Sequence, residues 1–176
     1  MVCVMLRFCA LASLLLVSTT AAADPPPVAQ VRTMLSSFEG GPSADAWEAL
    51  GPETLTVLEQ LYDDEGQPPY VRLRAVQATG HFPSESTRTF LKRVATQEGQ
   101  NDLLIRAAVR TMARAFGSSA LADIRPFLTH RATAVREGAV LALGSLESSR
   151  ARALLQARLD VERNTTVRAM LQRTLR

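Results

Sequence analysis

Arginine is the residue type in this chain best suited to binding a ligand, because its rigid guanidinium fork offers five N–H donors to an anion. Four arginines recur directly after Val or Ile, 34, 30 and 32 residues apart, at Arg72, Arg106, Arg136 and Arg168. The residue seven positions before each Val or Ile is acidic in three of the four cases, at Asp64, Glu98 and Asp160. An arginine in this pattern can bind an anionic ligand or form a structural ion pair, since both environments use the same residue types.

The sequence contains no recognisable set of catalytic residues. The two histidines, His81 and His130, have no Cys, His or Asp at metal-ligand spacing. The acidic run Asp63-Asp64-Glu65 is expected to be a solvated turn at a helix end, because three consecutive acids do not converge on one point. Phosphate-binding glycine loops and nucleophile elbows are also absent from the sequence. We therefore expect no enzyme activity, no metal site and no cofactor.

The first residues predict export. Met1–Arg7 carries one positive charge, Phe8–Val17 is apolar, and Ala21-Ala22-Ala23 follows. This order is typical of a secretory signal peptide, and the apolar run is well short of the ~20 residues that span a bilayer. We predict cleavage near Ala23, a periplasmic or secreted mature chain and no transmembrane segment after signal removal. Cys3 and Cys9 leave with the signal, so the mature domain is expected to be stabilised without disulfides.

Composition and periodicity predict an all-α fold. Aromatic residues make up 5 % of the chain, and the alternation of β-branched residues that is typical of strands is absent. The arginine spacing is that of one helix pair per repeat, and Pro126 is expected to bend or restart the helix that contains it. Helix periodicity and stop signals predict helices over residues 28–38, 43–50, 52–62, 70–79, 84–96, 103–116, 120–129, 134–143, 149–159 and 166–175.

Two segments resemble a known repeat. YVRLRAVQATG at residues 70–80 and AVREGAVLALG at 134–144 are similar to the first helix of a HEAT-like repeat, in the short form of phycobilisome-lyase-type proteins. The resemblance covers residues 67–176 and implies an α-solenoid of stacked antiparallel helix pairs. It divides the chain into a signal peptide (1–23), an N-terminal helical cap or degenerate repeat (24–66) and a repeat array (67–176). A tetratricopeptide motif is matched once, at Trp47–Gly51, but Thr54 stands where that motif has tyrosine.

The resemblance also assigns roles to individual residues. It implies that the four recurring arginines form a structural ladder, bonded to acidic groups and helix-end carbonyls of adjacent repeats, and the acids seven positions before the anchors supply the partners. It further implies that the second helix of each pair lines the concave face. On this basis the candidate binding residues are Arg88, Lys92, Arg125, Arg150, Arg152 and Gln156.

Charge is unevenly distributed along the mature chain. Residues 24–65 carry nine acids and one arginine, a net charge of −8, whereas residues 103–176 carry five acids and thirteen arginines, a net charge of +8. This uneven distribution of charge favours solubility, head-to-tail contacts between copies of the chain, or binding of an anionic partner. We predict an exported, non-catalytic binding or scaffolding module with an acidic protein partner.

Two alternatives remain open. The first is an accessory role beside a lyase-like enzyme, since some relatives of these repeats act on bilins; the predicted mature chain has no cysteine for bilin attachment. The second is binding of the phosphate backbone of a nucleic acid. Export argues against the second alternative, although extracellular DNA keeps it open.

Overall fold

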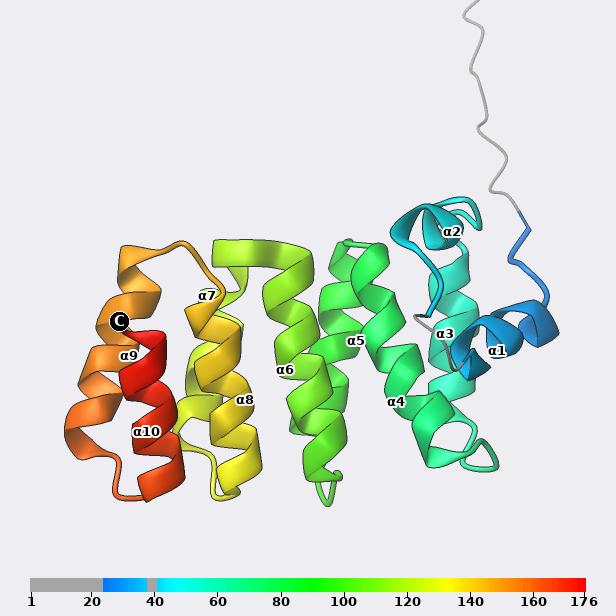
Figure 1. Cartoon of the computed structure of the whole chain (residues 1–176). Helices are drawn as coiled ribbons and strands as arrows, with labels where there is room; N and C mark the ends of the chain where they lie inside the picture. Colours follow the sequence, from blue (N-terminus) through cyan, green and yellow to red (C-terminus); the bar gives the residue numbers. More distant parts are fainter. Residues whose placement is uncertain (1–23, 38–40) are drawn as a thin grey trace, which may run out of the picture.

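The computed structural model describes residues 24–37 and 41–176, and these form a row of helices side by side (Figure 1). The signal peptide and its predicted cleavage near Ala23 lie outside the described residues. The helices are α1 (Val28–Ser36), α2 (Ala44–Glu48), α3 (Thr54–Asp63), α4 (Pro69–Ala78), α5 (Glu85–Thr96), α6 (Asp102–Phe116), α7 (Leu121–Ile124), α8 (Thr133–Gly144), α9 (Ser149–Val161) and α10 (Thr165–Thr174). Within residues 24–37 and 41–176 no strand occurs, so the predicted all-α fold is confirmed.

Side-chain caps explain where many of the helices begin. Ser43, Ser84 and Ser148 each accept a hydrogen bond from the backbone N–H three residues further on. The side-chain oxygens of Asn101 and Asn164 bind backbone N–H groups in the first turns of α6 and α10. These bonds satisfy donors that have no partner within a helix. With one exception, the helix ends lie within two residues of the predicted ends.

The exception is the segment 120–129, for which one helix, bent or restarted at Pro126, is predicted. The structure has a 3-10 turn at Gly117–Ala120, the four residues of α7, and a second 3-10 turn at Arg125–Thr129. Pro126 lies in the first turn of the second 3-10 segment. Because proline has no N–H group and its ring clashes with the preceding turn, the chain restarts at Pro126 in a tighter helix, which is one of the two expected outcomes.

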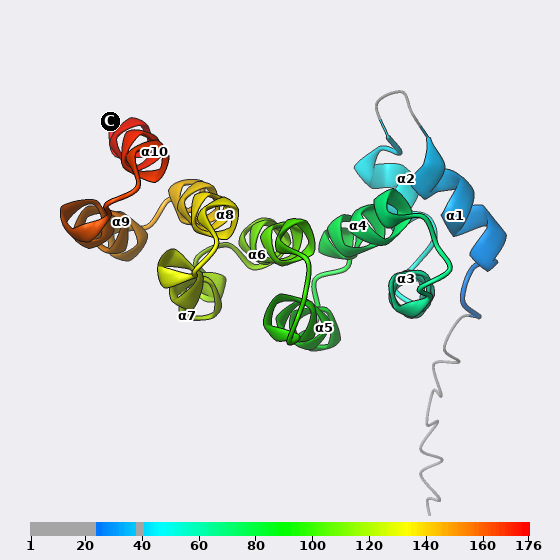
Figure 2. The same cartoon turned by 90° about the horizontal axis from the view of Figure 1, so that it is seen from below.

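The helices are arranged in two layers that bend together. Figure 2 shows α4, α6, α8 and α10 along the inside of the bend and α3, α5, α7 and α9 along the outside. The concave face is therefore lined by the first helix of each predicted repeat, and the expectation that the second helices line it is wrong. Successive helices of the inner layer contact each other directly.

Small residues in the inner layer explain the direction of the bend. A Cβ atom built on Gly80 would lie 2.9 Å from Thr111 Cγ2 on α6, and one on Gly138 would lie 2.7 Å from Arg106 Cγ on α6. At the end of α8, a Cβ on Gly144 would overlap Thr174 Cγ2 on α10. Because glycines let these helices approach closely, the inner layer is shorter than the outer layer, and the solenoid curves toward it.

The core runs the length of the row between the two layers. The apolar residues that precede the four recurring arginines, Val71, Ile105, Val135 and Val167, are all buried. So are Ala75, Val109, Ala139 and Leu171, which lie four residues further along each helix. This spacing places both sets on one helix face, so each repeat buries its apolar stripe against the next.

Candidate functional site

Arg72, the first arginine of the predicted ladder, bonds to the preceding helix. Its Nε donates to the backbone carbonyl of Tyr62 over 2.7 Å, and its guanidinium lies 5.2 Å from the centre of the Tyr62 ring. The partner is a helix-end carbonyl of α3, one of the two kinds of partner that the ladder requires. Arg72 therefore holds α4 against the end of α3.

Arg136 and Arg168 meet around one buried acid, Glu162, which is 4 % exposed. Arg136 Nε lies 3.1 Å from Glu162 Oε2, and Arg158 Nε lies 2.9 Å from the same oxygen. Arg168 donates to the backbone carbonyl of Glu162 over 2.9 Å. Burial acts to raise the pKa of Glu162, but the backbone N–H of Asn164 and the guanidinium groups of Arg158 and Arg136 outweigh it and lower the pKa to about 2.

The acids predicted to pair with the ladder do not do so. Asp64 accepts hydrogen bonds from the Gly66 backbone and the Gln67 side chain, and Asp160 accepts one from Gln156. Both lie at or near the end of a helix, where their carboxylates accept hydrogen bonds from residues within four positions along the chain. The paired acid is Glu162, because the loop after α9 turns its carboxylate back toward Arg136 and Arg158.

Arg106 differs from the other three ladder arginines. Among residues 24–37 and 41–176 its side chain has no hydrogen-bond or ion-pair partner. Its stem instead packs beside Gly138 of α8, where a Cβ atom would lie 2.7 Å from Arg106 Cγ. The guanidinium lies at the concave surface of the solenoid, so a structural role for Arg106 has less support than for the other three.

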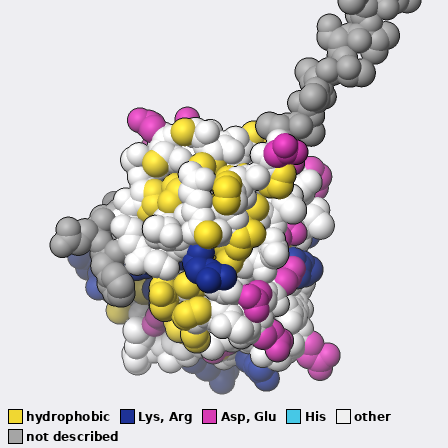
Figure 3. All heavy atoms as spheres, turned by 90° about the vertical axis from the view of Figure 1, so that its right-hand side faces the viewer, with side chains coloured by type: hydrophobic (Ala, Val, Ile, Leu, Met, Phe, Trp, Pro, Cys, Tyr) yellow, Lys and Arg dark blue, Asp and Glu magenta, His cyan; other side chains and the backbone are white. Residues whose placement is uncertain are grey.

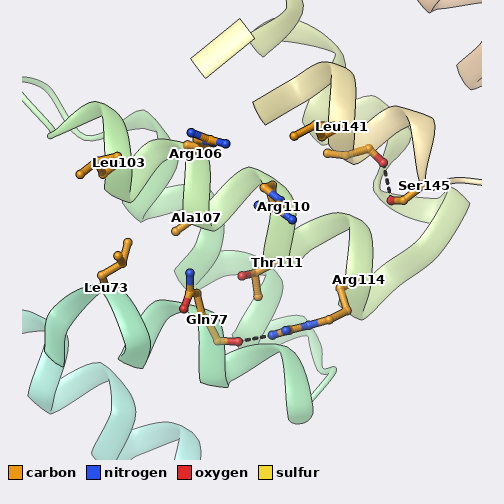
Figure 4. Close-up of a pocket in the computed structure, with 11 residues that line it drawn as sticks. Leu73, Gln77, Leu103, Arg106, Ala107, Arg110, Thr111, Arg114, Leu141 and Ser145 are labelled. Carbon is orange, nitrogen blue, oxygen red and sulfur yellow. Dashed lines mark hydrogen bonds between the residues drawn. The ribbon is translucent and has the colours of Figure 1, made fainter. Parts of the chain in front are cut away.

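A groove of about 490 Å³ lies on this concave face, between α4, α6 and α8. Figure 4 shows its lining, with Arg106, Arg110 and Arg114 following one another along α6. Apolar side chains lie beside this row, at Leu73 on α4, Leu103 at the start of α6 and Leu141 on α8. Leu103 is 57 % exposed, so its side chain is accessible to a ligand in the groove. The groove therefore combines a row of positive charges with apolar walls.

Arg114 is held at one end of this row. It donates to the backbone carbonyl of Gln77 (Figure 4). Its guanidinium also packs over Gly80, where a Cβ atom would lie 2.6 Å from Nη2. Burial and the neighbouring charge of Arg110 lower the pKa of Arg114. No carboxylate of the described part of the chain forms an ion pair with Arg106, Arg110 or Arg114. We name these three residues the arginine row.

The binding residues predicted from the sequence lie on the outer layer, away from the groove. Arg88 and Lys92 on α5 share one acid, Asp123, at 3.1 and 3.3 Å, and Arg88 also lies over the Phe116 ring. Their charges are thus partly neutralised. Arg152 on α9 donates to the Leu175 carbonyl. The structure brings Arg88 and Lys92 together, and leaves apart from them the exposed residues Arg125, Arg150, Arg152 and Gln156. A binding role for these six residues stays a prediction.

The sequence does contain a signal for the arginine row. Arginines at positions 106, 110 and 114 are four residues apart within a predicted helix, which places them on one helix face. This row was not identified from the sequence because Arg106 was assigned to the ladder and the first helices were expected on the convex face.

Other surfaces offer less for an anionic ligand. Figure 3 shows the N-terminal end of the row, where hydrophobic side chains gather and acidic side chains lie to one side. His81 stacks on Trp47 at 6.0 Å, and burial together with the charge of Arg114 lowers the pKa of His81.

The described residues contain no group of three His, Cys, Asp or Glu side chains that could hold a metal ion. They also contain no helix with the length and hydropathy needed to cross a membrane.

Comparison with known proteins finds one family match, over the C-terminal part of the chain. No curated protein matches it. A family model described as HEAT repeats matches residues 95–176, which lie inside the predicted array of 67–176. The domain boundary at residue 66 stays a prediction. HEAT repeats in general mediate protein–protein interaction and act as non-catalytic scaffolds. With this match and its two layers of stacked helices, the protein is a HEAT-like repeat protein folded as an α-solenoid.

Proposed function

We propose that the protein is an exported, non-catalytic binding module that holds an acidic protein partner on its concave face. The observation that carries this proposal is the arginine row, three cations on one helix face with no carboxylate paired to them among the described residues. Like charges four residues apart in a helix destabilise it by about 0.2–0.5 kcal/mol per pair. An anionic ligand removes this repulsion and gains charge-assisted hydrogen bonds from the guanidinium groups.

The composition of the groove favours a protein partner. Leu73, Leu103 and Leu141 lie beside the arginines, and apolar side chains of a polypeptide can bury this surface. A sugar-phosphate backbone has no equivalent groups. The net charge of +8 over residues 103–176 also attracts an acidic partner from a distance.

The binding proposal can be tested with poly-L-glutamate as the acidic probe. We compare the purified protein with two variants of equal charge change, Arg106→Glu/Arg110→Glu on the concave face and Arg150→Glu/Arg152→Glu on the outer layer. We expect the concave variant to lose at least about tenfold in affinity, because each guanidinium–carboxylate contact contributes about 1 kcal/mol or more. The outer variant should remain within a few-fold of wild type at physiological salt, where charges beyond about 8 Å are screened. Equal losses in both variants would place the site elsewhere.

The proposal of export has its own test. It is supported by the short apolar run and the Ala21-Ala22-Ala23 sequence of the N-terminal segment. Intact-mass analysis of protein recovered from the exported fraction should give a chain that begins at Asp24. A membrane-bound product that retains residues 1–23 would contradict export by cleavage.

A further inference from the structure

We infer that the groove accepts one amphipathic helix of the partner, with carboxylates repeated every fourth residue and apolar side chains on either side of them. This inference rests on the proposed function, since it names the segment that an acidic partner would place in the groove. Four features of the groove carry it: the spacing of the arginine row, the contacts at its ends, its apolar walls, and its lack of a sheet edge.

The spacing of the row is that of a helix surface. Arg106, Arg110 and Arg114 lie four residues apart on α6, and a rise of about 1.5 Å per residue places successive Cα atoms about 6 Å apart along the axis. A second helix laid along α6, with acids at every fourth residue, repeats its carboxylates at the same interval. Each carboxylate can then meet one guanidinium.

The two ends of the row contact opposite walls of the groove. At one end, the Arg106 stem lies against Gly138 of α8, where there is no room for a Cβ atom. At the other end, Arg114 is bonded to the Gln77 carbonyl of α4 and packs over Gly80. The Arg114 guanidinium, which is bonded before binding, loses less conformational entropy when a carboxylate arrives.

The apolar walls favour a helix over an extended segment. Leu73 lies on the α4 side of the row and Leu141 on the α8 side, with Leu103 near the start of α6 (Figure 4). A helix can present a central acidic stripe and apolar residues on both flanks, because residues three and four apart share a face. An extended segment presents a single file of side chains to one surface and would leave the walls uncovered.

Backbone hydrogen bonding also favours a helical partner over an extended one. The groove is built from α4, α6 and α8, and the described residues include no strand whose edge could pair with an added strand. An extended partner would bring backbone N–H groups against the guanidinium groups of the arginine row, which have no acceptor, whereas a helix satisfies its own backbone groups.

The test uses two peptides of identical composition, each with four glutamates and six leucines among alanines and glutamines. In the first, glutamates repeat every fourth residue with leucines on both flanks; in the second, the same residues are rearranged so that glutamates fall on all sides of the helix. We expect the first peptide to bind the purified protein at least about tenfold more tightly in fluorescence anisotropy, and to gain helical circular dichroism on binding. Equal affinities would overturn the helix register.

Matched serine variants test the apolar contact. Leu103→Ser should weaken the first peptide about fivefold to tenfold while leaving poly-L-glutamate binding unchanged, because only the peptide buries the leucine. Val161→Ser, on the outer layer and 65 % exposed, is the control and should change neither. An unchanged peptide affinity in Leu103→Ser would show that the apolar wall at Leu103 does not contribute to peptide binding.

The outcomes separate this inference from the proposed function. If poly-L-glutamate binds through the arginine row but the two peptides do not differ, the acidic partner stands and the helix inference fails. If neither peptide nor poly-L-glutamate binds, the proposed function fails as well. A DNA duplex that binds more tightly than the first peptide at the same salt would assign the groove to a phosphate backbone.

Discussion

Replacing Glu162 with glutamine tests whether the buried acid holds the C-terminal repeats together. Glu162 accepts hydrogen bonds from Arg136 and Arg158 and from the backbone N–H groups of Arg163 and Asn164, at 3.1 and 2.9 Å for the two backbone donors. The glutamine side chain keeps the shape but removes the charge, and its amide N–H₂ group can face a guanidinium donor. Two half-buried arginines, Arg136 and Arg158, are then left without their carboxylate, which is costly.

The size of the effect follows from the lowered pKa. The carboxyl pKa falls from 4.5 to about 2, and each pKa unit corresponds to 1.36 kcal/mol, so the ionised group contributes about 3 kcal/mol to folding. Because the pKa is lower in the folded state, this contribution is fully present above about pH 5 and is lost as the pH falls toward 2. For a domain of this size, Glu162→Gln should lower the melting temperature at neutral pH by about 6–12 °C.

The assay is urea unfolding at pH 7 and at pH 3, with Glu147→Gln as the matched control. Glu147 is exposed and has no ion-pair partner among the described residues, so its variant should behave as wild type. Glu162→Gln should lose about 3 kcal/mol at pH 7 and distinctly less at pH 3, where part of the wild-type contribution is already gone. A loss at pH 7 below about 0.5 kcal/mol, or one that does not diminish at pH 3, would show that the charge of Glu162 does not stabilise the fold.

Further predictions concern packing, the ladder and ligand binding. Gly144→Ala should lower the unfolding free energy by about 1–3 kcal/mol, because a Cβ atom there overlaps Thr174 Cγ2, and adding Thr174→Ser should restore most of it by removing that methyl group while keeping the hydroxyl. Without rescue, the overlap is not the cause. Arg72→Ala should cost about 1–3 kcal/mol through the lost bond to the Tyr62 carbonyl, whereas Arg173→Ala, exposed on α10, should change stability by less than about 0.5 kcal/mol in the same denaturant melts; equal effects would leave the ladder without support. Poly-L-glutamate binding should weaken steeply as salt rises, because exposed charges are screened, and a salt-independent affinity in the same titration would exclude an electrostatic site.

Much of the fold was predictable from the sequence because local signals agree with one another. Capping residues such as Ser84 and Asn164 mark helix starts, and the buried Val or Ile before each recurring arginine fixes the repeat. These features depend on residues close together in the chain. The segment around Pro126 was harder, since the choice between a bent helix and a 3-10 turn depends on packing against α8.

The site was less predictable because its position depends on contacts between repeats. The direction of the bend follows from close approaches at Gly80, Gly138 and Gly144, which sequence spacing does not reveal. The helix-end carbonyls expected as ladder partners are present, but the expected acids were wrong for a related reason. Spacing placed Asp64 and Asp160 at the right distance along the chain, but each carboxylate bonds within its own turn, and the loop after α9 supplies Glu162 instead.

The central claim is that the concave arginine row, and not the outer layer, binds an acidic partner. The most direct measurement is a titration of ¹⁵N-labelled protein with the peptide that repeats glutamate every fourth residue, followed by amide chemical shifts. We expect the largest shifts on α4, α6 and α8, around Gln77, Arg106, Arg110 and Arg114. Shifts concentrated on α5 and α9, around Arg88 and Arg152, would contradict it.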